Sequence, residues 1–395
     1  MRKLEPVVGV DVAKGSSVVQ AFRKRNEPFG KAVDIMHEKS GFEQFSGMLD
    51  MLQIETGLAP VVVLEATGHY HRALVSYLDR SGYTYYIVNP LQSKRAKGTQ
   101  LRKVKTDATD AWHLAEMYYR GDVKPHRTWE ETFTELQHLT RQHEFVTGIF
   151  VQAKLNSRAL LEQVFPRYEG LFSNVFSVTS LTVLARCLEG GTADWIELIQ
   201  GSTGRSRSKQ WTIDKAKKLE GVLGDWRETR RSPSQSQALL GMVSLLLTMM
   251  RQLEELEKQM EDVAMSLPEV ELVKSIPGIG TKLAAAIIAE MGDVRQFSDA
   301  KQLVAFAGLD PGIFSSGKFT ATSTRITKRG SKRLRRSLYL AVQCGIRKSA
   351  NARIHSYYEK KRKEGKPYKV VVIACANKLL HHIYAILQKG KPYQV

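Results

Sequence analysis

The first third of the chain alternates between short apolar runs and stretches of helical periodicity. Apolar or β-branched runs predict strands at Val7–Val12, Ser17–Phe22, Lys31–Met36, Val61–Leu64 and Tyr83–Val88. Apolar residues at helical spacing predict helices at Phe42–Ile54, His71–Ser81 and Thr106–Tyr119. Because strands that alternate with helices form a sheet covered by helices, residues 1–125 are expected to fold as an α/β domain with a mixed sheet.

The middle of the chain changes to long helical patterns. Helical periodicity runs from Glu130 to Phe165, ends at Pro166, and returns from Ser234 to Met265. Long helices of this kind often pair with each other or with another subunit. The intervening segment 190–225 is rich in Gly, Ser, Thr and charge, and is expected to be an inserted or mobile subdomain. Residues 126–266 are therefore predicted to be a helical coiled-coil linker with an insertion at about 168–231.

The last part of the chain is predicted to be mostly helical. Val270–Ser275 and Thr281–Met291 flank the compact turn Ile276–Gly280, which predicts a helix-hairpin-helix. A glycine-rich segment follows at Gly308–Gly317. The remaining patterns predict a basic helix at Lys328–Arg347 and a final helix at Val370–Leu387. Residues 267–395 are thus expected to form a C-terminal domain.

Composition narrows the class of protein. Hydrophobic residues make up 43% of the 395 residues and charged residues 25%, which excludes a wholly disordered chain. The three cysteines are far apart and give neither a disulfide framework nor a paired metal motif, which favours a reducing cytoplasm. The N-terminus lacks the apolar region of a signal peptide. The longest mainly apolar stretch recognised, Leu239–Met250, is too short to span a bilayer, so no membrane is expected.

Positive charge is concentrated in two segments. The formal net charge is +19, and residues 312–369 alone carry 17 Lys and Arg against two acids. A solvated face is the simpler interpretation, but apolar residues at helical spacing predict that the segment is folded and binds nucleic acid. A membrane surface is disfavoured because no basic helix has a wide apolar face. The expected nucleic-acid contacts are Lys94, Arg95, Lys97, Arg102, Lys103, Lys105, Lys318, Arg325, Lys328, Arg329, Lys332, Arg333, Arg335 and Arg336.

Four carboxylates occupy positions that predict a metal site. Asp11 lies at the end of the first strand, Glu65 ends the fourth, and Asp107 and Asp110 share one face of a predicted helix. Each alone is explained as a turn residue, a cap or a charge at a helix start. Together they would repel unless divalent cations neutralised them, and oxygen ligands suit Mg²⁺ or Mn²⁺. Two such ions about 4 Å apart can hold the attacking and leaving oxygens of a phosphodiester. This arrangement is typical of an RNase H-like nuclease.

The predicted hairpin offers a second kind of chemistry. Gly278 and Gly280 allow backbone amides to approach a phosphate, and the helix that starts at Thr281 presents its positive end there. Such a motif would bind the nucleic-acid backbone without reading sequence. A tight structural turn with no ligand is the alternative.

A hydroxyl nucleophile is a further candidate in the glycine-rich segment. Ser316 lies in Phe314-Ser315-Ser316-Gly317-Lys318, where a serine among cations could attack phosphorus. Residue chemistry alone leaves competitors, which are Ser315, Thr320, Thr322, Ser323, Thr324 and Thr327. The histidines offer no helical metal-ligand spacing, since His138 and His143 are five apart and His381 and His382 are adjacent.

These motifs, taken in order, resemble the DEDD insertion-sequence transposases of the one-ten group, which includes the Piv/MooV DNA invertases. The resemblance covers about 1–165 and 234–390. Its motifs are Gly9-Val10-Asp11-Val12-Ala13-Lys14, Glu65-Ala66-Thr67-Gly68, Lys105-Thr106-Asp107-Ala108-Thr109-Asp110-Ala111, Ser275-Ile276-Pro277-Gly278-Ile279-Gly280, and Phe306-Ala307-Gly308-Leu309-Asp310-Pro311 with Ser315-Ser316-Gly317.

The resemblance implies an architecture and a reaction. It implies a RuvC-like domain, a coiled-coil linker and a C-terminal transposase domain. Asp11, Glu65, Asp107 and Asp110 would bind divalent metal, and Ser316 would be the nucleophile. It further implies a homo-oligomer, a dimer or tetramer, with sites composed from different subunits. The partners would be donor and target DNA and a structured non-coding bridge RNA, in the cytoplasm of a bacterium or archaeon and associated with its nucleoid.

Three other functions fit parts of the sequence. A RuvC-like Holliday-junction nuclease would use the carboxylates with water as nucleophile and would need no serine. A sugar-kinase or actin-like ATPase also begins with a strand that carries Gly-x-Asp, but its phosphate loop is replaced here by Val12-Ala13-Lys14. A non-catalytic nucleic-acid-binding protein would not need all four carboxylates.

Overall fold

The computed structural model describes the chain in two compact units, Met1–Thr128 and Trp129–Val395, here called the N-terminal unit and the helical unit. The description leaves out residues 1–3, 67, 69, 89–92, 94–106, 124–130, 191–192, 205–206, 229–231, 313–314, 317–318, 321–324 and 395. The side chains at 107, 227–228, 315–316 and 319–320 are left out as well.

The N-terminal unit is built on a mixed five-stranded sheet in the order β3-β2-β1-β4-β5. Strands β1 (Val7–Val12), β2 (Ser16–Lys24) and β3 (Glu27–Met36) form an antiparallel meander. Strands β4 (Val61–Glu65) and β5 (Tyr85–Val88) continue the sheet from β1 in parallel. The predicted mixed sheet is confirmed. At their shared turn, β2 extends two residues and β3 four residues beyond the ends that the apolar pattern indicated.

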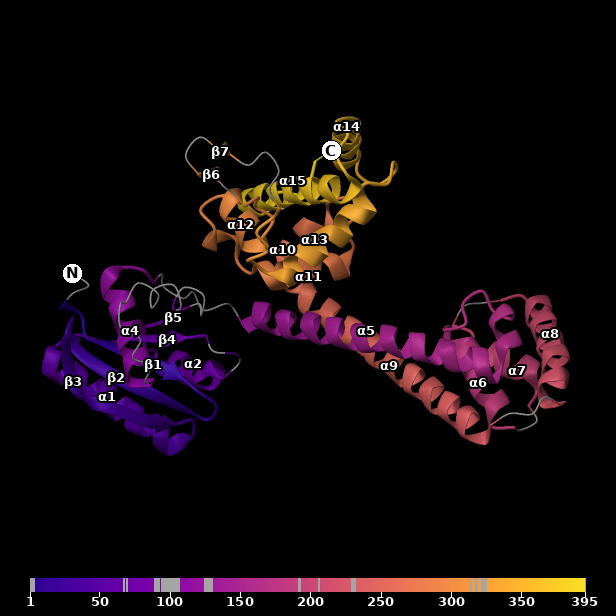
Figure 1. Cartoon of the computed structure of the whole chain (residues 1–395), viewed down its shortest axis with the longest axis horizontal. Coiled ribbons are helices and arrows are strands. Elements are labelled where there is room, and N and C mark those ends of the chain that lie inside the picture. Colours follow the sequence, from indigo (N-terminus) through magenta and orange to yellow (C-terminus); the bar gives the residue numbers. More distant parts are fainter. Residues whose placement is uncertain are drawn as a thin grey trace. The chain divides into compact units, whose positions relative to one another are not determined.

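Helices cover both faces of this sheet, so the unit has three layers. Helices α1 (Lys39–Thr56) and α2 (His71–Arg80) pack on the face that carries Val8, Val10 and Leu64. Helix α4 (Asp107–Arg120) packs on the opposite face, against Val7 and Val63. Figure 1 shows α4 and α1 on opposite sides of the strands. The alternation of side chains along each strand thus divides the apolar residues between two cores.

Two long helices pack against each other in the helical unit. Helices α5 (Glu131–Val164) and α9 (Pro233–Met265) pack along each other, and Figure 1 shows them side by side. Their ranges agree with the prediction to within one residue. A supercoil between them remains a prediction.

The segment between these helices is more regular than expected. The 3₁₀ turn η2 (Pro166–Gly170) is followed by α6 (Val178–Leu188), α7 (Trp195–Gly201) and α8 (Lys209–Glu228). The helices within 190–225 were not predicted from composition, because the buried residues of this segment are few and widely spaced. Trp195, Ile199 and Leu219 nevertheless join one core with α6 and the two long helices.

The remaining helices form a second core around α15 (Tyr368–Lys389). They are α10 (Pro268–Lys274), α11 (Thr281–Met291), the 3₁₀ turn η3 (Val294–Gln296), α12 (Ala300–Ala307), α13 (Lys332–Gly345) and α14 (Ala352–Lys363). Helices α12 and α14 were not predicted. In α14 only Ile354 is buried, so its sequence has almost no apolar periodicity.

Helix α15 corrects the expectation about apolar stretches. It has 22 residues and is long and apolar enough, by length and composition, to cross a membrane. Half of its most apolar window is buried inside the protein. Val372, Cys375 and Leu379 pack in the core of the helical unit, which accounts for the apolar character.

The basic helix begins four residues later than predicted. Backbone amides before α13 bond to the end of α12 instead of continuing a helix. The Lys328 N–H donates to the Gly308 carbonyl at 3.2 Å, and the Ser331 N–H to the Phe306 carbonyl at 2.7 Å. Lys328 has a φ of 54°, in the left-handed region. The Ser331 hydroxyl then accepts from the Leu334 N–H and caps α13.

Candidate active site and nucleic-acid surface

The two strand-borne carboxylates belong to neighbouring strands. The parallel register of β1 and β4 pairs Val10 with Leu64, and Asp11 and Glu65 each come one residue after this pair. Adjacent strands lie about 4.8 Å apart, and paired residues project to the same face. Both residues are half-buried. The sequence alternation places Asp11 and Glu65 on the face covered by α4.

Gly9 allows α4 to lie directly on the sheet. A Cβ atom at Gly9 would come within 1.9 Å of the Ala111 carbonyl oxygen, so only glycine fits there. Further along the helix, the Tyr119 hydroxyl donates to the Glu5 carbonyl at 3.0 Å. Because Ala111 lies over Gly9 and Tyr119 beside Glu5, α4 runs antiparallel to β1. Its first turn therefore lies toward the end of β1 that carries Asp11.

This first turn carries the other two predicted carboxylates. Asp107 begins α4 and Asp110 lies one residue before Ala111. The backbone thus brings the positions of Asp11, Glu65, Asp107 and Asp110 to one end of the sheet. The side chain of Asp107 lies outside the description. Among the side chains that are described, no three acids, histidines or cysteines gather closely enough to hold a metal.

A buried carboxylate that the sequence did not single out links α4 to the turn between β2 and β3. Glu116 is 6% exposed and accepts hydrogen bonds from Arg25 at 3.1 Å and from Arg120 at 2.9 Å. Burial raises the pKa of Glu116, but the two guanidinium groups outweigh it and the net pKa is lowered. Arg25 lies in the turn between β2 and β3, so this pair ties α4 to the meander. No sequence signal distinguished this pair from ordinary surface charges.

The predicted nucleophile lies in the helical unit. Ser315 and Ser316 form the short strand β6, which pairs antiparallel with β7 (Phe319–Thr320). Ser316 is opposite Phe319. Its side chain, together with Gly317 and Lys318, lies outside the described part of the chain. Two short paired strands therefore lie in and beside the glycine-rich segment singled out from the sequence.

The predicted basic contacts divide into two groups in the structure. Arg325, Lys328, Arg329 and Lys332 are exposed and form no ion pair with a described residue. Arg333, Arg335 and Arg336 have partners within the protein. The first cluster, Lys94, Arg95, Lys97, Arg102, Lys103 and Lys105, and also Lys318, lie outside the described residues.

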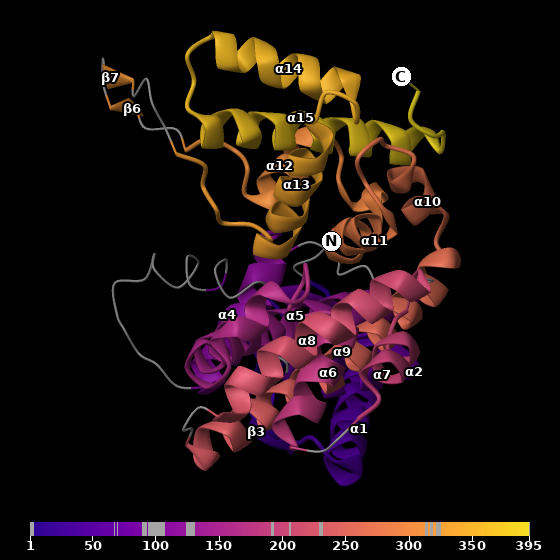
Figure 2. The ribbon, with the colours of Figure 1, turned by 90° about the vertical axis from the view of Figure 1, so that its right-hand side faces the viewer.

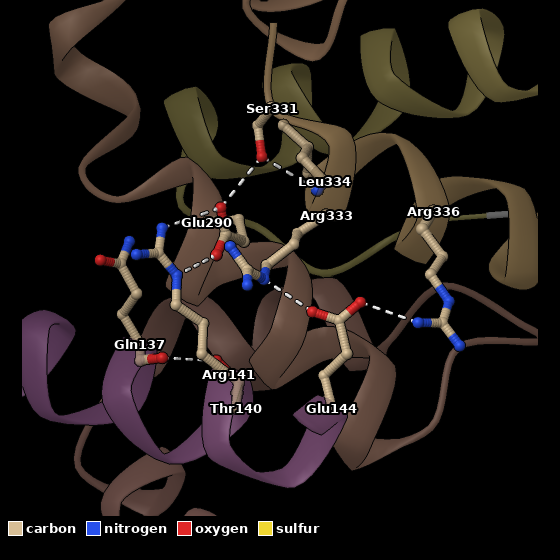
Figure 3. A network of polar contacts seen from close by, with 9 residues as sticks. All are labelled: Gln137, Thr140, Arg141, Glu144, Glu290, Ser331, Arg333, Leu334 and Arg336. Atoms are coloured by element: carbon tan, nitrogen blue, oxygen red, sulfur yellow. Dashed lines mark hydrogen bonds and ion pairs between the residues drawn. The ribbon is translucent and has the colours of Figure 1, made fainter. Parts of the chain in front are cut away.

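Glu144 of α5 binds two of these arginines, as Figure 3 shows. It accepts from Arg333 at 2.6 Å and from Arg336 at 2.7 Å. Arg335 donates to the Ala307 carbonyl at 2.8 Å. Beside this pair, buried Glu290 of α11 accepts from Arg141 at 2.7 Å and from the Ser331 hydroxyl at 2.9 Å. These contacts fasten α13 to α5 and α11.

The two hairpin glycines have different surroundings. Gly278 has a φ of 95°, and a Cβ atom there would lie 3.1 Å from the backbone of Gly345 at the end of α13. Its lack of a side chain is thus explained by packing. Gly280 precedes α11, is exposed, and has open space where a Cβ would project. Of the two, Gly280 is the position that an outside phosphate could approach.

Comparison with known families matches both ends of the chain. Residues 8–166 match a DEDD transposase model of the IS110 type, described as "Transposase". Residues 270–359 match the model described as "Transposase IS116/IS110/IS902 family". The first match spans all four predicted carboxylates, and the second spans Ser316. Together the two matches cover more than half of the chain.

Individual relatives include proteins of several mobile elements. An insertion element IS116 protein of 44.8 kDa from Streptomyces clavuligerus is 24% identical over 82% of each chain. The transposase for insertion sequence element IS1111A of Coxiella burnetii is 32% identical over 35% of this chain and 38% of its own. The pilin gene-inverting protein of Moraxella bovis is 30% identical over 31% of this chain and 38% of its own.

Among solved structures, RuvC of Thermus thermophilus in complex with a Holliday junction substrate is similar at a TM-score of 0.23 and 13% identity. The similarity covers 31% of this chain and 99% of that one.

Proposed function

The chain belongs to the IS116/IS110/IS902 transposase family, and from this premise we propose that it cleaves and exchanges DNA strands at an insertion sequence through a phosphoserine intermediate. The observation that carries the proposal is the convergence at one end of the sheet. The β1–β4 register and the contact of Gly9 with α4 bring four carboxylate positions together there. Structural packing alone does not require acidic residues at all four positions.

We assign the N-terminal unit an RNase H-like, RuvC-like role. The support is the strand order, an antiparallel meander followed by two parallel strands, with carboxylates at the ends of β1 and β4. Asp11, Glu65, Asp107 and Asp110 are the residues that would hold Mg²⁺ or Mn²⁺, because carboxylate oxygens are the ligands these ions prefer. When bound, the ions would stabilise the charge that develops on the phosphodiester oxygens.

Ser316 is the proposed nucleophile that forms the covalent link to DNA. Its Oγ attacks phosphorus and forms a P–O bond, while the bond from phosphorus to the 3′ oxygen breaks. The serine loses its proton, and the leaving 3′ oxygen gains one. A serine-linked 5′ phosphate and a free 3′ hydroxyl result. The 3′ hydroxyl of another strand then attacks the link, restores the phosphodiester and releases the serine. The number of phosphodiester bonds is conserved, so no external energy source is needed.

Several partners complete the proposal. Donor and target DNA are the substrates, and the exposed cations Arg325, Lys328, Arg329 and Lys332 are contacts for their phosphates. A structured bridge RNA would select both DNAs by base pairing, and a dimer or tetramer would bring two sets of strands together. The compartment would be the cytoplasm, at the nucleoid. These assignments rest on the resemblance described from the sequence.

The experiment separates binding from chemistry. Ser316→Ala should abolish strand exchange between donor and target DNA, because the covalent link cannot form, and should leave nucleic-acid binding unchanged. Ser315→Ala is the matched control and should retain exchange. Continued exchange by the Ser316→Ala protein would contradict the assignment of the nucleophile.

A Holliday-junction nuclease remains the second candidate, since it would use the same four carboxylates. It would hydrolyse the junction with water, and both serine variants would then be active. The absence of any protein–DNA link during cleavage would favour this alternative.

A further inference from the structure

We propose that a groove between α14 and α15 binds the phosphodiester backbone of a nucleic acid, at a site separate from the predicted contacts in 318–336. The groove consists of two adjoining hollows of about 620 and 680 Å³. Both hollows are lined by Arg353 and His382, so they form one continuous depression. Figure 2 shows α14 lying alongside α15. The groove is closed at one end by the segment Lys391–Gln394 that follows α15.

The cations in this groove come from matching faces of the two helices. Arg353 and Lys360 are seven residues apart on α14, and Lys378, His382 and Lys389 recur at helical spacing on α15. No acidic residue lines either hollow. Among the described residues, none makes an ion pair with the five groove cations, which are Arg353, Lys360, Lys378, Lys389 and Lys391. Glu359, the acid within α14, lies next to Lys360 in sequence but lines neither hollow, and Glu364, which caps the helix, is paired with Lys361 and Lys366.

Two tyrosines hold the cations in place. Lys378 lies 4.6 Å above the ring of Tyr357, and Arg353 lies 5.6 Å from the ring centre of Tyr393. A ring face attracts a cation but leaves its hydrogen-bond donors free for another partner. The groove thus presents positive groups that are oriented without being neutralised.

Buried polar atoms in the groove have no partner within the described chain. The Tyr393 hydroxyl and the His382 Nδ1 are both buried and make no hydrogen bond. Both side chains line the 620 Å³ hollow, together with Arg353. A buried polar atom without a partner costs free energy, about 1–3 kcal/mol, unless a ligand supplies the bond. The pKa of His382 is lowered by burial and by Lys378, Arg353 and His381, which reports the positive potential of this groove.

The dimensions suit a chain of phosphates better than a single anion. From Lys378 to Lys389, α15 rises about 16 Å. Phosphates of one strand succeed each other about every 3.4 Å along a duplex axis. The row of cations therefore faces about four or five consecutive phosphates, whereas a free phosphate or nucleotide would engage only part of it.

The position of the groove next to the hairpin supports the same ligand. The Tyr393 N–H donates to the Ser275 hydroxyl at 2.8 Å, and the Asn351 amide donates to the Pro277 carbonyl at 3.3 Å. The groove thus begins beside the turn Ser275–Gly280, the predicted backbone-binding hairpin. A strand held at that turn would continue along α15.

The test measures binding by the full chain, without added metal, so that cleavage plays no part. The groove variant is Lys360→Gln, Lys389→Gln and Lys391→Gln, three exposed lysines outside the core. Its matched control is Lys217→Gln, Lys258→Gln and Lys301→Gln, which removes the same charge from exposed lysines elsewhere. Affinity is measured by fluorescence anisotropy over a series of KCl concentrations, with single-stranded RNA, single-stranded DNA and duplex DNA of one sequence.

We expect the slope of log affinity against log salt to fall by about 2–3 in the groove variant and by less than 1 in the control. If the groove variant loses affinity for RNA alone, or for DNA alone, the groove binds that nucleic acid. If it loses affinity for all three probes, the groove binds the phosphodiester backbone that they share. Equal slopes for the two variants on every probe would overturn the proposal. A second variant, Arg353→Gln with Lys378→Gln, repeats the test, and thermal melting verifies that each protein is folded.

The inference rests on the proposed function only in requiring a protein that holds nucleic acid. The groove proposal and the proposed recombinase chemistry can be refuted independently. A groove variant that binds like its control but still forms a Ser316 link refutes the groove alone. A chain that loses binding with the groove variant but never forms the link refutes the recombinase chemistry alone.

Discussion

At the scale of single residues, Gly9 determines how closely α4 approaches the sheet. The Ala111 carbonyl occupies the space that any side chain at residue 9 would need. Asp107 and Asp110 sit in the first turn of the same helix. The steric demand at one glycine therefore controls the distance between the two carboxylates on α4 and the two on the strands.

Replacing Gly9 by Ala should displace α4. The clash with the backbone oxygen is expected to destabilise the contact by about 1–3 kcal/mol, as overpacking does elsewhere. Amides of Ala111–Arg120 should lose protection in hydrogen–deuterium exchange, and metal-dependent cleavage should fall. The control is Gly47→Ala in α1, where nothing lies within 4 Å of the new methyl group. Unchanged protection of α4 in the Gly9→Ala protein would contradict this account.

The sequence allowed the carboxylates to be predicted, but not the residues that position them. Asp11 and Glu65 follow from strand ends, because apolar runs reveal where buried strands stop. The roles of Gly9 and of the Arg25–Glu116 pair depend on α4 crossing β1, which no local pattern encodes. The same limit applies to Glu144, whose partners Arg333 and Arg336 lie far along the chain.

At the scale of elements, Glu144 joins the long helix α5 to the basic helix α13. It accepts from both Arg333 and Arg336. Burial raises the pKa of Glu144, and the two arginines lower it more, so its folded-state pKa lies below the ordinary value. A carboxylate with a lowered pKa stabilises the fold above the ordinary value of about 4.3, and the contribution disappears as pH falls through the lowered value.

Glu144→Gln should therefore have an effect that depends on pH. At pH 7 the variant should unfold at lower urea concentration than the native chain, because two cations lose their partner. As pH falls through the lowered pKa of Glu144 the two proteins should converge, because the native carboxylate then becomes protonated. Glu135→Gln, at an exposed acid on the same helix, is the control and should leave the urea concentration of unfolding unchanged both at pH 7 and in acid. A difference that persists unchanged into acid would show that the ion pairs do not contribute.

The elements that the sequence predicted well have strong apolar periodicity. Helices α5, α9 and α11 agree to within a residue, and β1 agrees fully. Helices α8 and α14 were missed because polar and charged residues outnumber their buried ones. The start of α13 was misplaced because the competing bonds of Lys328 and Ser331 come from α12. The α14–α15 groove could not be anticipated without α14.

At the scale of the whole molecule, the chain separates its proposed chemistry between two units. The cores of the N-terminal unit contain only residues between Val7 and Val123, and those of the helical unit only residues from Phe133 onward. The carboxylates belong to the first unit and Ser316 to the second. The proposed reaction uses both the carboxylates and the serine, so each set should be indispensable for the covalent step.

The most direct test of this account is the detection of a covalent protein–DNA link. The chain is incubated with Mg²⁺, its copurifying RNA and DNA that carries the junction of the element, and is then separated on a denaturing gel. We predict a slower-migrating protein–DNA species that disappears with Ser316→Ala and with Asp11→Ala. Cleaved DNA without any linked protein would contradict the account, and would indicate hydrolysis by the carboxylates alone.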